Sequence, residues 1–206
     1  MQINQSVLDK VKATNAQLLV VTKYWNASKT NTIRDWLKDE PCVLGWGENR
    51  TASLEEKLLP PEQTHFIGRL QSRQLSSIVQ HCKTIHSLAS LKHAQKLNLL
   101  AAENPLEVFI QVNVGEDPSK EGIAPSDLAD FLESLKSLEN INVIGLSTMG
   151  WGDFTENKKR QEFKSLIDLK NSYLPSGLTS AGTSRDYHLA LQEGIDIVRV
   201  GTAIVV

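Results

Sequence analysis

Short apolar runs rich in β-branched residues recur along this chain, and a stretch with helical spacing follows each of the first seven. The runs are 17–23, 42–47, 64–68, 84–87, 108–114, 141–146, 178–182 and 195–200. Runs of this kind predict buried strands, and their alternation with helices predicts right-handed βαβ units and a parallel sheet. Eight such units close most economically as a barrel. We therefore expect a single α/β domain over residues 1–206, a (β/α)8 TIM barrel, with an open doubly wound sheet as the alternative.

Bulk composition excludes several classes of protein. The chain is 40% hydrophobic and 22% charged, which is ordinary for a folded domain. A net charge of -2 argues against a non-specific nucleic-acid surface. No apolar run is long enough to span a membrane, and the first residues lack a secretory signal, so we expect a cytoplasmic protein. Cys42 and Cys82 are too few and too unpatterned for a disulfide scaffold or a zinc site.

Lys23 ends the first apolar run. A lysine is almost never fully buried without a partner. Loss of hydration at the mouth of a buried strand favours the neutral amine, which is the form that attacks a carbonyl or forms a Schiff base. The alternative is a lysine that simply extends to water. The run by itself favours the second interpretation, and only the rest of the chain reverses that preference.

Two segments with small and hydroxylated residues follow the seventh and eighth runs. Residues 180–186 lead into a helix expected over 184–193, whose N-terminus would offer N–H groups to a phosphate. Residues 200–203 include Gly201, which lets the backbone approach a ligand closely. Phosphate sites at these two loops recur in such barrels. Thr183 and Asp186 also have the spacing of a variant capping box, which needs no ligand, and the two interpretations are about even.

Arg199 is an unusual residue for the eighth run. Strand alternation places Ile197, Arg199 and Gly201 on one face of the strand. If the intervening valines face the helices, Arg199 points into the barrel mouth, where a guanidinium needs an acceptor. That acceptor is either a carboxylate such as Glu48 or a group on a ligand, for example a pyridine nitrogen or a carboxylate.

Histidines and aromatic residues near the predicted strand ends have simpler interpretations. His65 and His86 have no acidic or cysteine residue at metal-ligand spacing, so we expect hydrogen-bonded structural histidines and no metal. Trp46, Trp151 and Phe154 could stack on a flat ligand, although packing in the core or at the rim is favoured. There is no GxGxxG after the first run, so a dinucleotide site is not expected.

The combination of these segments resembles the YggS/PROSC family, the pyridoxal phosphate homeostasis proteins, from about residue 17 to the end of the chain. The most specific of the segments are HFIGRLQS at 65–72 and RVGTAI at 199–204. The others are VTK at 21–23, GEN at 47–49, IHS at 85–87, QVN at 111–113, GL at 145–146 and GTSRD at 182–186.

This resemblance implies a fold type III barrel like the N-terminal domain of alanine racemase, without the second domain of that enzyme. It also implies a site for pyridoxal 5′-phosphate (PLP), in which Lys23 forms the Schiff base. Seven residues would contact the cofactor: Lys23, Asn49 near the ring, Thr183, Ser184, Gly201 and Thr202 around the phosphate, and Arg199 at the pyridine nitrogen.

An arginine opposite the pyridine nitrogen disfavours protonation of the ring and makes it a weaker electron sink. We therefore expect a monomeric PLP carrier that acts in intracellular PLP homeostasis, without robust catalytic activity, and whose recipients are PLP-dependent apo-enzymes. The first alternative is a PLP-dependent amino-acid racemase. Others are a barrel aldolase or isomerase that uses Lys23 and Glu48 on a phosphorylated sugar, and a purely structural or partner-binding barrel.

Overall fold

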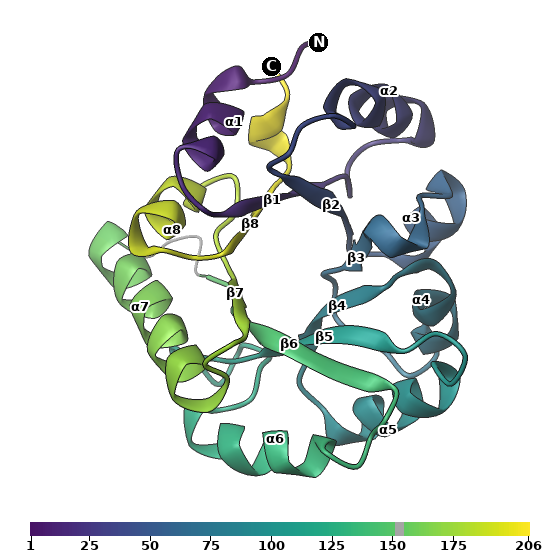
Figure 1. Cartoon of the computed structure of the whole chain (residues 1–206), viewed down its shortest axis with the longest axis vertical. Helices are drawn as coiled ribbons and strands as arrows, with labels where there is room; N and C mark the ends of the chain where they lie inside the picture. The colour runs from purple at the N-terminus through teal and green to yellow at the C-terminus, as the bar shows by residue number, and fades with distance from the viewer. Residues whose placement is uncertain (151–154) are drawn as a thin grey trace.

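Eight parallel strands close into a barrel in the order in which they follow one another along the chain. The structure is a computed structural model that describes residues 1–150 and 155–206. In Figure 1 the strands form the centre and the helices surround them. The strands are β1 (Gln17–Val21), β2 (Val43–Glu48), β3 (Thr64–Phe66), β4 (Thr84–Leu88), β5 (Leu106–Gln111), β6 (Ile141–Ser147), β7 (Leu178–Ser180) and β8 (Ile197–Val200). The expected (β/α)8 barrel is thus confirmed, and the open sheet is wrong.

Helices alternate with these strands and cover the outside of the barrel. They are α1 (Gln5–Lys12), α2 (Ala27–Leu37), α3 (Thr51–Lys57), α4 (Leu75–His81), α5 (Leu91–Leu100), α6 (Leu128–Leu135), α7 (Glu156–Tyr173) and α8 (Tyr187–Glu193). Short 3-10 turns cover Pro61–Gln63, Pro125–Asp127 and Thr202–Ile204. None of the helices in the described part of the chain is long and apolar enough to cross a membrane.

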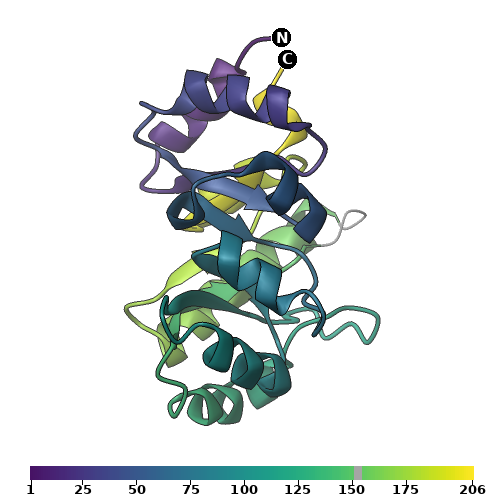
Figure 2. The same cartoon turned by 90° about the vertical axis from the view of Figure 1, so that its right-hand side faces the viewer.

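The barrel closes where the first strand pairs with the last. Leu19 lies opposite Arg199 and Val20 opposite Val200 in a parallel β1–β8 pair. The two ends of the chain also meet, because the backbone N–H of Asn4 donates to the carbonyl of Ile204 at 2.9 Å. Figures 1 and 2 show the two termini side by side.

Strand alternation separates two apolar layers. In β1, Leu18 and Val20 belong to the large core that packs beneath the helices, whereas Leu19 points into the barrel. In β8, Val198 and Val200 join the outer core, which leaves Arg199 on the inner face, as the sequence predicts. The inner apolar group is small and consists of Leu19, Phe109 and Ile197, with Leu44, Ile67 and Ile144 packed against it.

Several element boundaries differ from the sequence prediction. β1 ends at Val21, two residues before the expected end, so Lys23 lies in the turn that follows. β7 is confirmed in spite of its weak strand propensity, although it stops at Ser180. The helix after it was expected from Ser184 but begins at Tyr187, because residues 184–186 form a turn. Sequence patterns locate helices and strands well, but they locate the residues at which these elements begin and end poorly.

The rest of the barrel interior is polar. His65 Nδ1 lies 2.9 Å from His86 Nε2, and His86 Nδ1 lies 2.9 Å from the hydroxyl of Ser180. The His86 ring stacks on Phe109 with ring centroids 4.3 Å apart. The prediction of hydrogen-bonded structural histidines is therefore confirmed. Burial lowers the pKa of His65 to about 4 and holds the pKa of His86 well below its ordinary value, so both rings are neutral at pH 7.

These neutral histidines predict a loss of stability in mild acid. A histidine whose pKa is lower in the folded state contributes stability above the unfolded-state pKa of about 6.5, and this is lost as pH falls towards about 4 for His65. The free energy of unfolding should fall by up to about 1.4 kcal/mol per pH unit for each histidine within this window. Urea denaturation between pH 7 and 4.5 measures this slope. His65→Gln removes one of the two histidines that take up a proton on unfolding, so it should make the free energy of unfolding less dependent on pH. An unchanged dependence would contradict the assignment of His65 as a neutral buried histidine.

Candidate functional site

A cavity of about 380 Å³ lies at the carboxyl ends of the strands, next to β1, β7 and β8. Its lining includes six of the seven residues expected from the sequence: Lys23, Thr183, Ser184, Arg199, Gly201 and Thr202. The cavity thus joins the turn after β1 to the loops after β7 and β8, which are far apart in sequence. The carboxyl ends of the strands are where functional sites of such barrels lie.

Lys23 reaches the cavity from a tight turn. The backbone N–H of Trp25 donates to the carbonyl of Thr22 at 2.8 Å and closes the turn around Lys23. The Lys23 side chain is half-buried, and its Nζ lies 4.8 Å from the centroid of the Tyr24 ring. Leu19 and Val21 precede it on the inner face of β1, so alternation directs Lys23 inward. The structure thus places a primary amine at the mouth of the barrel.

Backbone N–H groups converge on one oxygen between the last two loops. Ser184 Oγ accepts hydrogen bonds from the N–H of Gly201 at 3.0 Å and of Ala203 at 3.4 Å. A side chain at position 201 would not fit, because a Cβ there would lie 2.9 Å from the carbonyl oxygen of Val21. Two N–H donors aimed at a hydroxyl oxygen make a position that an oxygen of a phosphate can occupy.

The contacts of a capping box are present in the 183–186 segment, whereas the helix end expected to bind a phosphate is not. Asp186 Oδ1 accepts hydrogen bonds from the backbone N–H of Thr183 at 2.6 Å and from the Thr183 hydroxyl at 3.0 Å. The two residues whose spacing suggests a capping box are therefore in contact. These contacts order the loop and leave Ser184 directed at Gly201. The expected helix N-terminus at Ser184 is absent, since α8 begins at Tyr187. Any anion site here therefore consists of loop N–H groups and not of a helix end.

Arg199 is buried beneath the cavity and has carbonyl partners. Its Nη1 donates to the carbonyl of Ser180 at 2.8 Å and to the Ser180 hydroxyl at 3.0 Å, and its Nη2 donates to the carbonyl of Thr148 at 2.7 Å. Burial lowers the pKa of Arg199 to about 10, so it keeps its charge at neutral pH. Arg199 therefore presents a fixed positive charge to the cavity.

Glu48 is not the partner of Arg199. Its carboxylate pairs with Lys57 and accepts from the hydroxyl of Thr22, all on the outer side of the sheet. The alternative of an Arg199–Glu48 ion pair is therefore wrong. Glu48 is fully buried and is not among the described residues that line the cavity, so it is also badly placed as the acid or base of an aldolase.

Asn49 is the one expected residue that the structure does not bring into the cavity. It follows β2, and its backbone packs so closely on Gly68 that a Cβ on Gly68 would lie 2.3 Å from the Asn49 carbonyl oxygen. Its side-chain Oδ1 is buried and has no hydrogen-bond partner among the described residues. The motif drew attention to Asn49, but Asn49 is not among the described residues that line the cavity.

Other lining residues escaped the sequence prediction. Ile67 follows His65 on the inner face of the chain after β3, so strand alternation could have identified it. Met149, whose Sδ lies 3.4 Å from Arg199 Nη2, comes from the loop after β6 and carries no comparable signal. Trp46 is buried in the outer core and is not among the described residues that line the cavity, whereas Trp151 and Phe154 lie outside the described residues.

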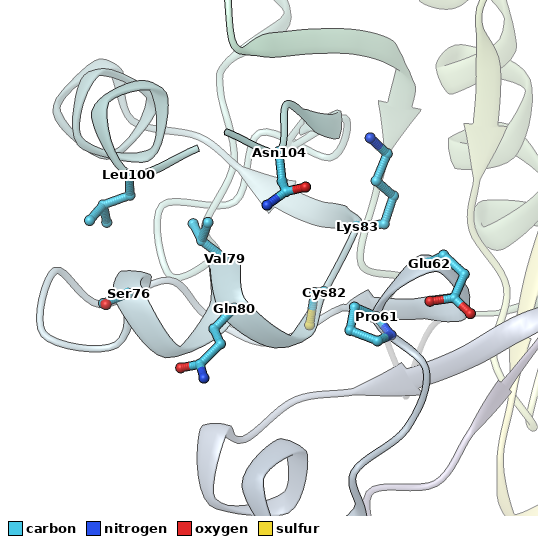
Figure 3. Close-up of a pocket in the computed structure, with 9 residues that line it drawn as sticks. All are labelled: Pro61, Glu62, Ser76, Val79, Gln80, Cys82, Lys83, Leu100 and Asn104. Atoms are coloured by element: carbon cyan, nitrogen blue, oxygen red, sulfur yellow. The ribbon is translucent and has the colours of Figure 1, made fainter. Parts of the chain in front are cut away.

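A second cavity, of about 540 Å³, lies at the opposite end of the strands (Figure 3). Its lining comes from α4, the end of α5 and the segments that precede β3, β4 and β5. The lining includes the thiol of Cys82, whose pKa is raised by burial, so it stays protonated at neutral pH. It also includes Lys83, whose amine donates to the carbonyl of Pro105 at 2.6 Å. No group of three or more His, Cys, Asp or Glu side chains in the described ranges could hold a metal ion. The amine, the loop donors and the buried guanidinium make the first cavity the candidate site.

Comparison with known proteins agrees with this geometry. The sequence matches the family model of the alanine racemase N-terminal domain over residues 7–206. A pyridoxal phosphate homeostasis protein of Aquifex aeolicus is 33% identical over 199 residues, which cover 87% of this chain and 84% of that protein.

Solved structures give the same result at the level of the fold. The structure of PipY from Synechococcus elongatus PCC7942 without PLP has a TM-score of 0.84 and 28% identity, and covers 100% of both chains. The structure of PipY with PLP bound has a TM-score of 0.79 and 26% identity, and covers 97% of this chain and 100% of that one. Sequence and fold agree: the chain belongs to the alanine racemase N-terminal domain family and, within it, to the pyridoxal phosphate homeostasis proteins.

Proposed function

We propose that this chain binds PLP in the cavity around Lys23 and takes part in PLP homeostasis. The observation that carries the proposal is that one cavity holds the amine of Lys23, the N–H donors near Ser184 and the guanidinium of Arg199. The relatives support it, because the Aquifex aeolicus protein is named for PLP homeostasis and PipY has a structure with PLP bound.

The residues present match the chemical groups of PLP one by one. Lys23 Nζ is a primary amine that can add to the aldehyde carbon, and loss of one water then leaves a C=N bond, the Schiff base. The N–H groups of Gly201 and Ala203, with the hydroxyls of Ser184, Thr183 and Thr202 nearby, can donate hydrogen bonds to the phosphate. Asn49 has no assigned contact in this scheme.

Arg199 decides what kind of PLP protein this would be. PLP supplies an electron sink when its pyridine nitrogen is protonated. A buried guanidinium facing that nitrogen disfavours the protonated ring, because two positive charges would then meet. The site is therefore better suited to holding PLP than to forming carbanions from amino acids.

In this proposal residues 1–206 act as one domain and as a monomer, and PLP-dependent apo-enzymes receive the cofactor. The open rim supports release to a partner, since Tyr24 is 72% exposed beside the cavity. An amino-acid racemase is the alternative, and proton exchange at Cα distinguishes the two. A racemase must exchange the Cα proton of amino acids with deuterated water far faster than free PLP does.

Replacement of Lys23 tests the attachment. Wild-type protein mixed with PLP should show a visible absorption band that borohydride removes, and Lys23→Ala should lack this band because it has no amine at the cavity mouth. Lys29→Ala is the matched control, since Lys29 lies nearby against the Trp25 ring and does not line the cavity. A wild-type protein that takes up no PLP would overturn the proposed function.

Replacement of Ser184 tests the phosphate loops. Ser184→Ala should weaken binding of PLP by about ten- to a hundredfold, because a hydrogen bond to a charged group contributes roughly 1.5–3 kcal/mol. Binding of pyridoxal, which lacks the phosphate, should change little. Fluorescence titration with both ligands measures the two affinities, and an equal loss for both would show that Ser184 does not act through the phosphate.

A further inference from the structure

A buried ion pair lies behind the turn that carries Lys23. Lys57, the last residue of α3, contacts the carboxylate of Glu48, the last residue of β2. The two side chains are 1% and 0% exposed. Removal of two charges from water costs several kcal/mol per ion and is seldom recovered by the pair alone. Replacement of such a pair by apolar residues is often neutral for stability, so its presence here suggests a local task.

Thr22, the residue before Lys23, is the common partner of this pair. Lys57 Nζ donates to the backbone carbonyl of Thr22 at 2.7 Å, and the hydroxyl of Thr22 donates to the Glu48 carboxylate. The backbone N–H of Thr22 donates to the carbonyl of Gly47 at 3.0 Å. Each polar group of Thr22 thus makes a hydrogen bond, and the ion pair supplies the partner in two of the three.

Lys57 and the cavity lie on opposite sides of the sheet, so Lys57 does not contact a ligand in the cavity. Val21 and Lys23 line the cavity, whereas Thr22 between them faces outward and is fully buried. Neither Lys57 nor Glu48 is among the described residues that line the cavity. The contact through which Lys57 reaches the turn of Lys23 is the backbone carbonyl of Thr22.

The turn around Lys23 depends on the Thr22 carbonyl. β1 ends at Val21, so Lys23 itself has no place in the strand ladder. The Thr22 carbonyl accepts from Trp25 N–H at 2.8 Å, which closes the turn, and from Lys57 Nζ, which ties the turn to α3. Without Lys57 this carbonyl would keep only the bond within the turn, and the Glu48 carboxylate would lose its cation.

From this geometry we infer that Lys57 is a positioning residue for Lys23. Together with Glu48 it fixes the Thr22 carbonyl and so sets where the Lys23 amine stands relative to the phosphate loops. The inference rests on the proposed function, because it concerns attachment of PLP at Lys23. It assigns Lys57 no contact with PLP. A displacement of a reacting group by about 1 Å can cost up to about a hundredfold in rate, so such a device has a measurable effect.

The test uses a paired replacement that leaves no unpaired buried charge, Glu48→Gln with Lys57→Met. Lys57→Met alone would bury an uncompensated carboxylate and could prevent folding. The matched control is Glu40→Gln with Lys12→Met, which makes the same changes in an ion pair that precedes β1 and β2 at the other end of the strands. Circular dichroism and thermal unfolding first establish that both variants are folded.

Two ligands separate positioning from general damage. PLP reports attachment at Lys23. Pyridoxine 5′-phosphate, which has a hydroxymethyl group in place of the aldehyde, reports binding of the phosphate and the ring without attachment. In the Glu48/Lys57 variant, the rate of appearance of the visible band with PLP should fall by about tenfold or more. Its affinity for pyridoxine 5′-phosphate should stay close to that of the wild type, and the Glu40/Lys12 variant should match the wild type with both ligands.

The results of these measurements distinguish failure of this inference from failure of the proposed function. If the wild type and the Glu48/Lys57 variant take up PLP at the same rate, Lys57 does not position Lys23, and the proposed function stands. If the variant loses affinity for pyridoxine 5′-phosphate as strongly as it loses attachment of PLP, its effect is general and the inference is again overturned. If the wild type itself takes up no PLP, both proposals fall.

Discussion

The site depends on the pairing of β1 with β8. This pair closes the barrel and places Val20 beside Val200, so the turn that carries Lys23 and the loop that carries Gly201 leave the sheet at the same point of its rim. The contact is close enough that a Cβ at Gly201 would meet the carbonyl of Val21. An amine from the start of the chain and N–H donors from its end thereby share one cavity. An open sheet made of the same strands would leave them far apart.

Polar groups divide between the two faces of the sheet. Inside, Arg199 is held by the carbonyls of Ser180 and Thr148, and its charge has no ion-pair partner among the described carboxylates. Outside, Lys57 and Glu48 neutralise each other beneath α3 and hold the backbone of Thr22. One face thus keeps a fixed positive charge available to a ligand, and the other uses opposite charges to hold the turn.

This arrangement gives the proposed function a physical basis. An amine, a set of N–H donors and a guanidinium correspond to the aldehyde, the phosphate and the pyridine nitrogen of PLP. In the proposed function, the guanidinium lies at the pyridine nitrogen and leaves the ring a poor electron sink, so the site favours holding PLP over reactions at an amino-acid substrate. A protein that holds and releases the cofactor needs retention at Lys23 and an accessible rim, and Lys23 is half-buried beside the exposed Tyr24.

Sequence alone determined the barrel, the inward face of Arg199 and six of the residues that line the cavity. Eight apolar runs that alternate with helical ones carry the fold, because period and length are local properties of a chain. Loop composition after the last two strands identified Ser184 and Gly201, since small residues near a strand end are also a local signal.

Tertiary structure decided which of those residues meet and what holds them. Asn49 belongs to a family motif, but it packs its backbone against Gly68 and is not among the described residues that line the cavity. Glu48 looked available to Arg199 or to a substrate, and instead it pairs with Lys57 on the far side of the sheet. The contact of Lys57 with the Thr22 carbonyl had no sequence signal, because it joins a helix end to a turn 35 residues earlier. Local pattern gives the direction of a side chain along a strand, whereas its partner depends on which segments the closed barrel brings together.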